Sequence, residues 1–106
     1  MYTALDKATV AELLQALPMW SGDEREIRAH FEFDDFRGAM QFMQACVDGI
    51  EQRNHHPVWT NKFNVVDVRL STFDIGNLVT RKDIDVAHFM TMMLAQYGSQ
   101  FGHVTP

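Results

Sequence analysis

The sequence predicts a two-layer α+β domain in which helices cover one face of an antiparallel sheet. Two observations lead to this prediction. Apolar residues recur at helical spacing in three stretches, and they alternate with polar residues in stretches between them. The length of 106 residues suits a single domain over 1–106 with a core of its own.

The first element is expected to be a helix over residues 6–17. Its apolar residues fall at positions i, i+3, i+4 and i+7, which form one stripe on a helix. Asp6 or Thr9 can cap its start, and Pro18 can end it.

The next stretch, residues 26–33, alternates between apolar and polar side chains, which is typical of a half-buried strand. A shorter strand around residues 19–21 would pair with it as a hairpin. A second helix should follow, capped by Asp34 or Asp35 and running to about Gln52, because apolar residues again recur at helical spacing.

The second half of the chain repeats this order of strands and helix. We expect a short strand over residues 58–60, a turn at Asn61-Lys62 and the longest strand over residues 63–72. Gly76-Asn77 is typical of a loop.

The last helix is predicted over residues 82–97, with Gly98 as its stop. Thr80 and Asp83 have the spacing of a capping box at its start. This helix is apolar on two sides, so one side should cover the sheet and the other should meet a second subunit. The residues after Phe101 are expected to be frayed.

Composition excludes several classes of function. A net charge of -5 without any basic cluster disfavours a direct nucleic-acid ligand. The chain has a single cysteine, Cys46, which excludes an intramolecular disulfide and fits a reducing compartment. No secretory leader and no apolar run of about 20 residues is present, so we expect a cytoplasmic protein without a membrane span.

The tripeptide His55-His56-Pro57 is the most informative motif. Proline restricts its own backbone and pushes His56 toward extended geometry, so the pair should lie on a stiff turn after a helix. Imidazoles titrate near neutral pH and can transfer protons in both directions. A metal site is disfavoured, because adjacent histidines diverge and the other candidate ligands are scattered.

Other residues surround this turn in a recognisable order. Glu51 precedes His55 by four positions, Ser71-Thr72 ends the long strand, and Asp83 follows. In this order and spacing the chain resembles the pterin-4a-carbinolamine dehydratase family. The resemblance covers most of the chain beyond the first helix, and its further positions are Trp20, Phe31-Glu32-Phe33, Asp35-Phe36, Phe42-Met43, Trp59, Phe63, Leu70 and Ile84.

The resemblance implies a β-β-α-β-β-α core with a four-stranded sheet and an extra N-terminal helix. It also implies the dehydration of a 4a-hydroxytetrahydropterin to quinonoid dihydropterin and water, a step of tetrahydrobiopterin recycling, with no metal and no cofactor. Members of the family pair their sheets edge to edge as homodimers, and these often stack through helices as homotetramers.

By the same resemblance, His55 and His56 are the catalytic histidines, and Glu51 and Asp83 are the acidic neighbours that orient and tune them. Contacts to the substrate are implied for Pro57, Trp59, Ser71, Thr72 and Phe73.

Two positions depart from the family pattern. Phe73 stands where a third active-site histidine is usual, and Asn54 where an acidic residue is common. The Phe73 ring either packs in the protein or stacks on a pterin, but it carries no proton. A missing acid or base costs about 10²–10⁴-fold in rate. His30 and His88 are the remaining non-terminal histidines that could stand in.

The departures leave two alternatives beside the dehydratase. One is a weakened or inactive relative that serves as a dimerising module and binds a protein or a pterin. The other is a dehydratase-like enzyme acting on a molybdopterin-related compound. Retained Glu51, His55, His56 and Asp83 favour catalysis, whereas Phe73 and Asn54 favour the module.

Overall fold

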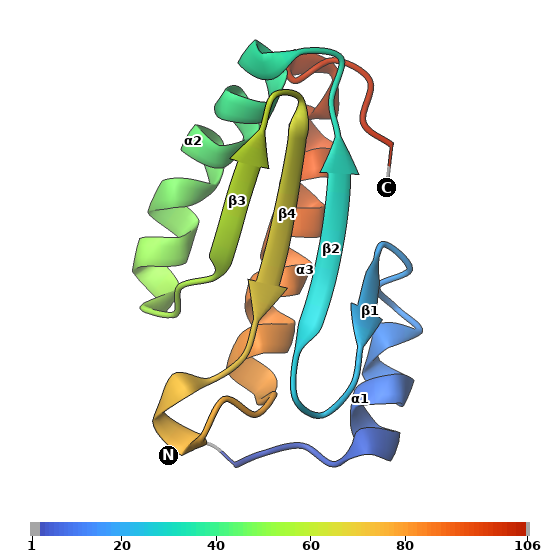
Figure 1. Cartoon of the computed structure of the whole chain (residues 1–106), viewed down its shortest axis with the longest axis vertical. Helices are drawn as coiled ribbons and strands as arrows, with labels where there is room; N and C mark the ends of the chain where they lie inside the picture. Colours follow the sequence, from blue (N-terminus) through green and yellow to red (C-terminus); the bar gives the residue numbers. More distant parts are fainter. Residues whose placement is uncertain (1–2, 106) are drawn as a thin grey trace.

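The computed structural model of the chain describes residues 3–105 and confirms the α+β class (Figure 1). In chain order the helices and strands are α1 (Lys7–Leu14), β1 (Trp20–Gly22), β2 (Ile27–Glu32), α2 (Phe36–Arg53), β3 (Val58–Lys62), β4 (Val65–Leu70) and α3 (Arg81–Tyr97). Two short 3₁₀ helices, Phe73–Ile75 and Gly98–Gln100, lie before and after α3. No helix within residues 3–105 has the length and apolar character needed to cross a membrane.

The four strands form one antiparallel sheet in the order β1-β2-β4-β3. Helices α2 and α3 pack against each other on one face of it, with α3 running behind the strands in the view of Figure 1. The alternation along β4 shows the two faces: Val66, Val68 and Leu70 are buried against the helices, whereas Asp67 and Arg69 are exposed. The opposite face of the sheet is therefore polar and open.

A cluster of aromatic rings fills one end of the core. Phe42 on α2 packs against Phe31 and Phe33 on the neighbouring strand segment, with ring centroids 5.5 and 5.3 Å away. Phe101, beyond α3, completes the cluster at 5.8 Å from Phe42. The contacts of Phe42 with Phe31 and Phe101 are edge-to-face, and such contacts add to the apolar burial of each ring.

Cys46 lies in the same helix layer and is fully buried. Burial in these apolar surroundings raises the pKa of the Cys46 thiol to about 12. Cys46 is therefore a residue of the hydrophobic core.

The helix ends agree with the capping residues expected from the sequence. Asp6 caps α1 and Asp35 caps α2, each accepting a hydrogen bond from a backbone N–H three residues on. At the other end of α2, Asn54 adopts the left-handed conformation with φ 49°, and its N–H donates to the Glu51 carbonyl. Asparagine tolerates this conformation well, so Asn54 ends the helix and turns the chain directly before His55.

The predicted turn at Asn61-Lys62 is wrong. Both residues belong to β3, and the turn consists of Phe63 and Asn64, so β4 begins only at Val65. The Asn61 amide donates to the carbonyls of Phe63 and Val65 and so supports the tighter turn from within the strand. Phe63 has φ 51°, a conformation that phenylalanine seldom adopts, which explains why sequence patterns missed it.

Two further boundaries differ from expectation. Helix α1 ends at Leu14, because residues 15–16 form turns that carry Leu17 into the core. The segment after Phe101 is not frayed, since Thr105 exchanges two backbone hydrogen bonds with Glu32 at 2.8 and 2.9 Å. Thr105 therefore pairs with the end of β2 that β1 does not cover.

The contact between α2 and α3 depends on Gly49. A Cβ atom at this position would lie 2.0 Å from Cζ of Phe89 on α3. Arg53 lies over the face of the same ring, with its guanidinium carbon 4.4 Å from the ring centroid. The glycine in the last turns of α2 is therefore required by the close approach of an aromatic ring.

We expect Gly49→Ala to lower the free energy of unfolding by about 1–3 kcal/mol, because the added methyl group overpacks the contact with Phe89. Helix propensity alone would give the opposite sign, about 1 kcal/mol in favour of alanine. Urea denaturation of the wild type, Gly49→Ala, Phe89→Leu and the double variant measures the effect. A stabilised Gly49→Ala protein, or strict additivity in the double variant, would contradict the packing argument.

Candidate active site

One cavity, of about 290 Å³, lies where three segments meet at one end of the sheet. The turn after α2, the segment after β4 and the first turn of α3 each contribute to its wall. Ligand cavities in proteins start at about 300 Å³, so its size suits a small ring system. Its lining residues are Asn54, His55, His56, Ser71, Thr72, Phe73, Asp74 and Lys82.

His55 is anchored by a buried carboxylate. Its side chain is 11 % exposed, and its Nε2 lies 2.5 Å from Oδ1 of Asp83, which is fully buried in the first turn of α3. The second oxygen of Asp83 accepts hydrogen bonds from Thr72 Oγ1 at 2.8 Å and from the Thr80 N–H at 2.9 Å. These donors satisfy the buried carboxylate, which the positive end of the α3 dipole also favours electrostatically.

The two threonines form a directed chain of hydrogen bonds toward Asp83. Thr72 Oγ1 and Thr80 Oγ1 lie 2.7 Å apart. Because the single hydroxyl proton of Thr72 goes to Asp83, the Thr80 hydroxyl must donate to Thr72. The oxygen of Thr80 in turn accepts from the Lys82 N–H at 3.2 Å, as expected of the residue that caps α3. The capping box predicted from Thr80 and Asp83 is confirmed.

His56 is paired with a carboxylate in a very different environment. Its Nε2 lies 2.6 Å from Oε1 of Glu51, and the two side chains are 56 % and 66 % exposed. Glu51 lies in the last turn of α2 and reaches forward across the left-handed Asn54. The cavity thus has one histidine held by a buried acid and one held by a solvated acid.

The other residues expected at the site divide into two groups. Ser71, Thr72 and Phe73 line the cavity, and the Phe73 side chain is 80 % exposed, so its ring is not packed in the protein. Trp59 does not line it: this side chain packs against the core beside Val68, its partner in the sheet. Pro57 also lies outside the lining and stiffens the turn between the histidines and β3.

Sequence reasoning missed two charged residues of the lining, Asp74 and Lys82. Both are adjacent to residues that were singled out, since Asp74 follows Phe73 and Lys82 precedes Asp83. Their positions in the sequence could have indicated both residues, because one lies beside the capping box of α3 and the other beside the end of β4, and these meet at the same edge of the sheet.

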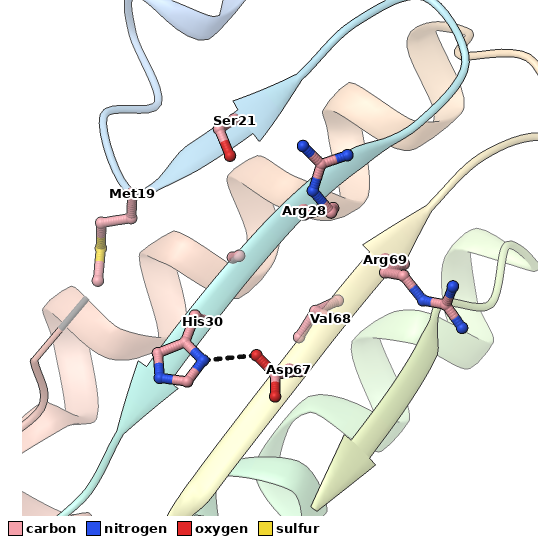
Figure 2. A pocket seen from close by; sticks show the side chains of 8 residues that line it. Met19, Ser21, Arg28, His30, Asp67, Val68 and Arg69 are labelled. Carbon is pink, nitrogen blue, oxygen red and sulfur yellow. Dashed lines mark hydrogen bonds and ion pairs between the residues drawn. The ribbon is translucent and has the colours of Figure 1, made fainter.

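His30 and His88 do not stand in for the missing histidine within this cavity. His88 is exposed on α3, and His30 lies on the open face of the sheet. Figure 2 shows His30 on β2 facing Asp67 on β4, with Nδ1 and Oδ1 2.6 Å apart. Nε2 of His30 also lies 3.3 Å from Glu32 Oε1. Within residues 3–105 no three His, Cys, Asp or Glu side chains gather as a possible metal site.

Comparison with known proteins agrees with the geometry. The family model described as "Pterin 4 alpha carbinolamine dehydratase" matches residues 3–93. A protein of Opitutus terrae named "Putative pterin-4-alpha-carbinolamine dehydratase" is 38% identical over 87 residues, 82% of this chain and 90% of that protein. A Rhodopseudomonas palustris protein of the same name is 44% identical over 85 residues, 78% of this chain and 83% of that protein.

A solved structure is similar as well. The transcriptional coactivator/pterin dehydratase from Brucella melitensis superimposes with a TM-score of 0.80 at 35% identity, covering 86% of this chain and 98% of that chain. A family model that matches nearly the whole chain identifies its class. The chain belongs to the pterin 4 alpha carbinolamine dehydratase family.

The hydrogen bond from Thr72 to Asp83 gives a first prediction for the site. Thr72→Val keeps the shape of the side chain but leaves a buried carboxylate oxygen with one donor fewer, which costs about 1–3 kcal/mol of unfolding free energy. Thr60→Val, at an exposed position of β3, is the matched control. Equal midpoints for both variants in urea denaturation would show that Thr72 contributes nothing to the buried network.

A second prediction concerns pH. Hydrogen bonds to Asp67 and then to Glu32 raise the pKa of His30 above its ordinary value of 6.5. The stabilisation by protonated His30 is therefore fully present below about pH 6.5 and is lost as the pH rises through the raised folded value. His30→Gln should destabilise more at about pH 5.5 than at about pH 8.5 in urea denaturation.

The matched variant for this test is Asp67→Asn, which removes the larger cause of the shift. In this variant the His30 pKa, followed by NMR, should move back toward its ordinary value. A His30 resonance that titrates at the same pH in both proteins would contradict the assignment.

Proposed function

We propose that the chain dehydrates a 4a-hydroxytetrahydropterin, a pterin-4a-carbinolamine, to quinonoid dihydropterin and water. The observation that carries the proposal is the histidine on the cavity wall that is anchored to a buried carboxylate, His55 on Asp83. Membership of the family supports the same reaction. The substrate loses the proton of N5 and the hydroxyl of C4a, so the site needs one base and one acid.

His55 is the better base. The buried carboxylate of Asp83 accepts the Nε2 proton of His55, which fixes the tautomer and leaves Nδ1 as the nitrogen that takes up a proton. The imidazolium formed on proton transfer is stabilised by the adjacent negative charge of Asp83. Thr72 and Thr80 hold that carboxylate in place, so they act as positioning residues.

His56 is the better acid. It lies on the same cavity, and Glu51 holds its ring in place from the solvent side through Nε2. Protonation of the leaving 4a-hydroxyl by His56 releases water, and the exposed imidazole regains its proton from bulk solvent. The two histidines thus serve the two ends of one elimination and have different environments suited to these roles.

Phe73 gives the cavity a flat, exposed ring without a proton. In the proposed complex this ring stacks on the pterin, while Ser71 and Thr72 lie beside it. Trp59 and Pro57 remain predicted substrate contacts, although neither residue lines the cavity. The absence of a third histidine at position 73 lowers the rate by about 10²–10⁴-fold relative to a three-histidine site.

We place this reaction in tetrahydrobiopterin recycling, as the family resemblance implies, and in the cytoplasm, as the single cysteine favours. Homodimers would form through the outer strands β1 or β3, and homotetramers through the helices, where Val47, Met92 and Tyr97 are exposed. A molybdopterin-related substrate is the alternative within the same chemistry.

A non-catalytic module is the second candidate function. The observation that favours it is Phe73, whose exposed ring keeps a binding surface in the place of a proton carrier. Such a protein would bind a pterin or a protein partner without turnover, on the same fold.

Turnover of a freshly generated 4a-hydroxytetrahydropterin, followed by stopped flow, tests the proposal. We expect acceleration by the wild type, a loss of about 10²–10⁴-fold in His55→Ala, and a gain in Phe73→His. His88→Ala, an exposed histidine away from the cavity, is the matched control and should equal the wild type.

Two other outcomes are informative. Acceleration only in Phe73→His would mean that the site is complete except at this position, and the wild type would then be a silenced relative. No acceleration in any of the four proteins would reject the dehydratase and leave the binding module.

A further inference from the structure

The candidate active-site cavity carries two charged residues that take no part in the proposed proton transfers. The turn after α2 contributes His55 and His56, which accept and donate the protons. The segment after β4 and the first turn of α3 contribute Asp74 and Lys82 to the same wall. In ligand sites a small number of placed polar groups fixes the orientation of the ligand. A carboxylate and an ammonium group on the wall of so small a cavity therefore point to recognition of a bound molecule.

Asp74 is placed to meet the edge of a flat ligand. It directly follows Phe73 in the 3₁₀ helix Phe73–Ile75. With three residues per turn, consecutive side chains of such a helix project about 120° apart. Both side chains are exposed and line the cavity. The ring of Phe73 can thus lie on the face of a flat molecule while the carboxylate of Asp74 reaches its edge.

Lys82 brings the opposite charge from a fixed backbone position. Its N–H donates to Thr80 Oγ1 at 3.2 Å as part of the cap of α3, and the next residue is the buried Asp83. The Lys82 side chain is half-buried and lines the cavity. An ammonium group has three N–H donors and no acceptor, so it selects an acceptor such as a carbonyl oxygen.

The pyrimidine edge of a pterin carries groups that complement these two side chains. Its 2-amino group and N3–H are neighbouring donors, and its 4-oxo oxygen is the acceptor beside them. A carboxylate can accept two parallel hydrogen bonds from such a pair of donors, and its charge strengthens both. The reacting atoms, C4a at the ring junction and N5 next to it, lie away from the donor pair. A pterin held at its pyrimidine edge by Asp74 and Lys82 can therefore offer C4a and N5 to the histidines.

We propose that Asp74 and Lys82 recognise the pyrimidine edge of the substrate and determine its orientation between His55 and His56. Asp74 accepts hydrogen bonds from the 2-amino group and N3–H, and Lys82 donates one to the 4-oxo oxygen. This inference rests on the proposed function and adds the atoms of the substrate that the site selects. The selectivity concerns the ring, which all reduced pterins share, and not the side chain on it.

Titration calorimetry with three matched ligands tests the assignment. The parent ligand is 6-methyl-7,8-dihydropterin. The second ligand has hydrogen in place of the 2-amino group, and the third has an amino group in place of the 4-oxo oxygen. The wild type should bind the parent at least about tenfold more tightly than either analogue, because each analogue loses a hydrogen bond to a charged group.

Variants assign each preference to one side chain. Asp74→Asn should lose most of the preference over the ligand without the 2-amino group, and Asp74→Glu, which keeps a carboxylate, should restore part of it. Lys82→Gln should lower only the preference over the 4-amino ligand. Asp48→Asn, exposed on α2, and Arg81→Gln, beside Lys82, are the matched controls. Neither control residue lines the cavity, so both variants should keep the wild-type preferences.

The failures of this inference and of the proposed function are distinguishable. A wild type that turns over the carbinolamine but binds the parent and the ligand without the 2-amino group equally would overturn the role of Asp74 and leave the dehydratase standing. An unchanged preference in Asp74→Asn, or an equal loss in Asp48→Asn, would overturn it too. Binding of none of the three ligands would reject the recognition of the ring, and the absence of turnover as well would reject the proposed function with it.

Discussion

The site depends on one buried carboxylate. Asp83 has no exposed surface, yet it carries a negative charge that must be compensated inside the protein. Its partners come from three separate segments: Thr72 after β4, the backbone of Thr80 at the start of α3, and His55 after α2. Removing one partner of a buried charge costs more free energy than the pair itself contributes to stability. The network therefore holds the three segments in fixed positions relative to one another. The geometry of the cavity follows from this constraint.

In the proposed reaction, the different surroundings of the two histidines determine which one accepts a proton and which one donates a proton. The carboxylate partner of His55, Asp83, is buried and has no contact with solvent. The carboxylate partner of His56, Glu51, is exposed to solvent. In the proposed reaction, a proton taken up by His55 stays beside the buried Asp83, while a proton given by His56 is replaced from water. Phe73 leaves this division intact, because it changes neither pair and adds only an apolar surface. A two-histidine site is thus chemically self-consistent.

The sequence predicted the elements well where the periodicity was strong and the caps were standard. The alternation in 26–33 and the Thr80–Asp83 capping box both correspond to real features. The turn at Phe63 was missed because phenylalanine is not a residue that favours the left-handed backbone conformation found here. Two contacts join distant parts of the chain: the pairing of Thr105 with Glu32 and the packing of Phe89 against Gly49. No local sequence pattern indicates such contacts.

Strand β4 connects the open face of the sheet to the candidate active site. Along β4 the even-numbered residues 66, 68 and 70 fill the core, whereas Asp67 and Arg69 face outward, and Ser71 continues this outward row. One residue later the chain bends inward, so that Thr72 reaches Asp83. The candidate active-site cavity therefore begins where the alternation of the strand ends. Changes at Arg69 alter the open face of the sheet and leave the buried network of Asp83 untouched, so the two faces of this strand end can vary independently.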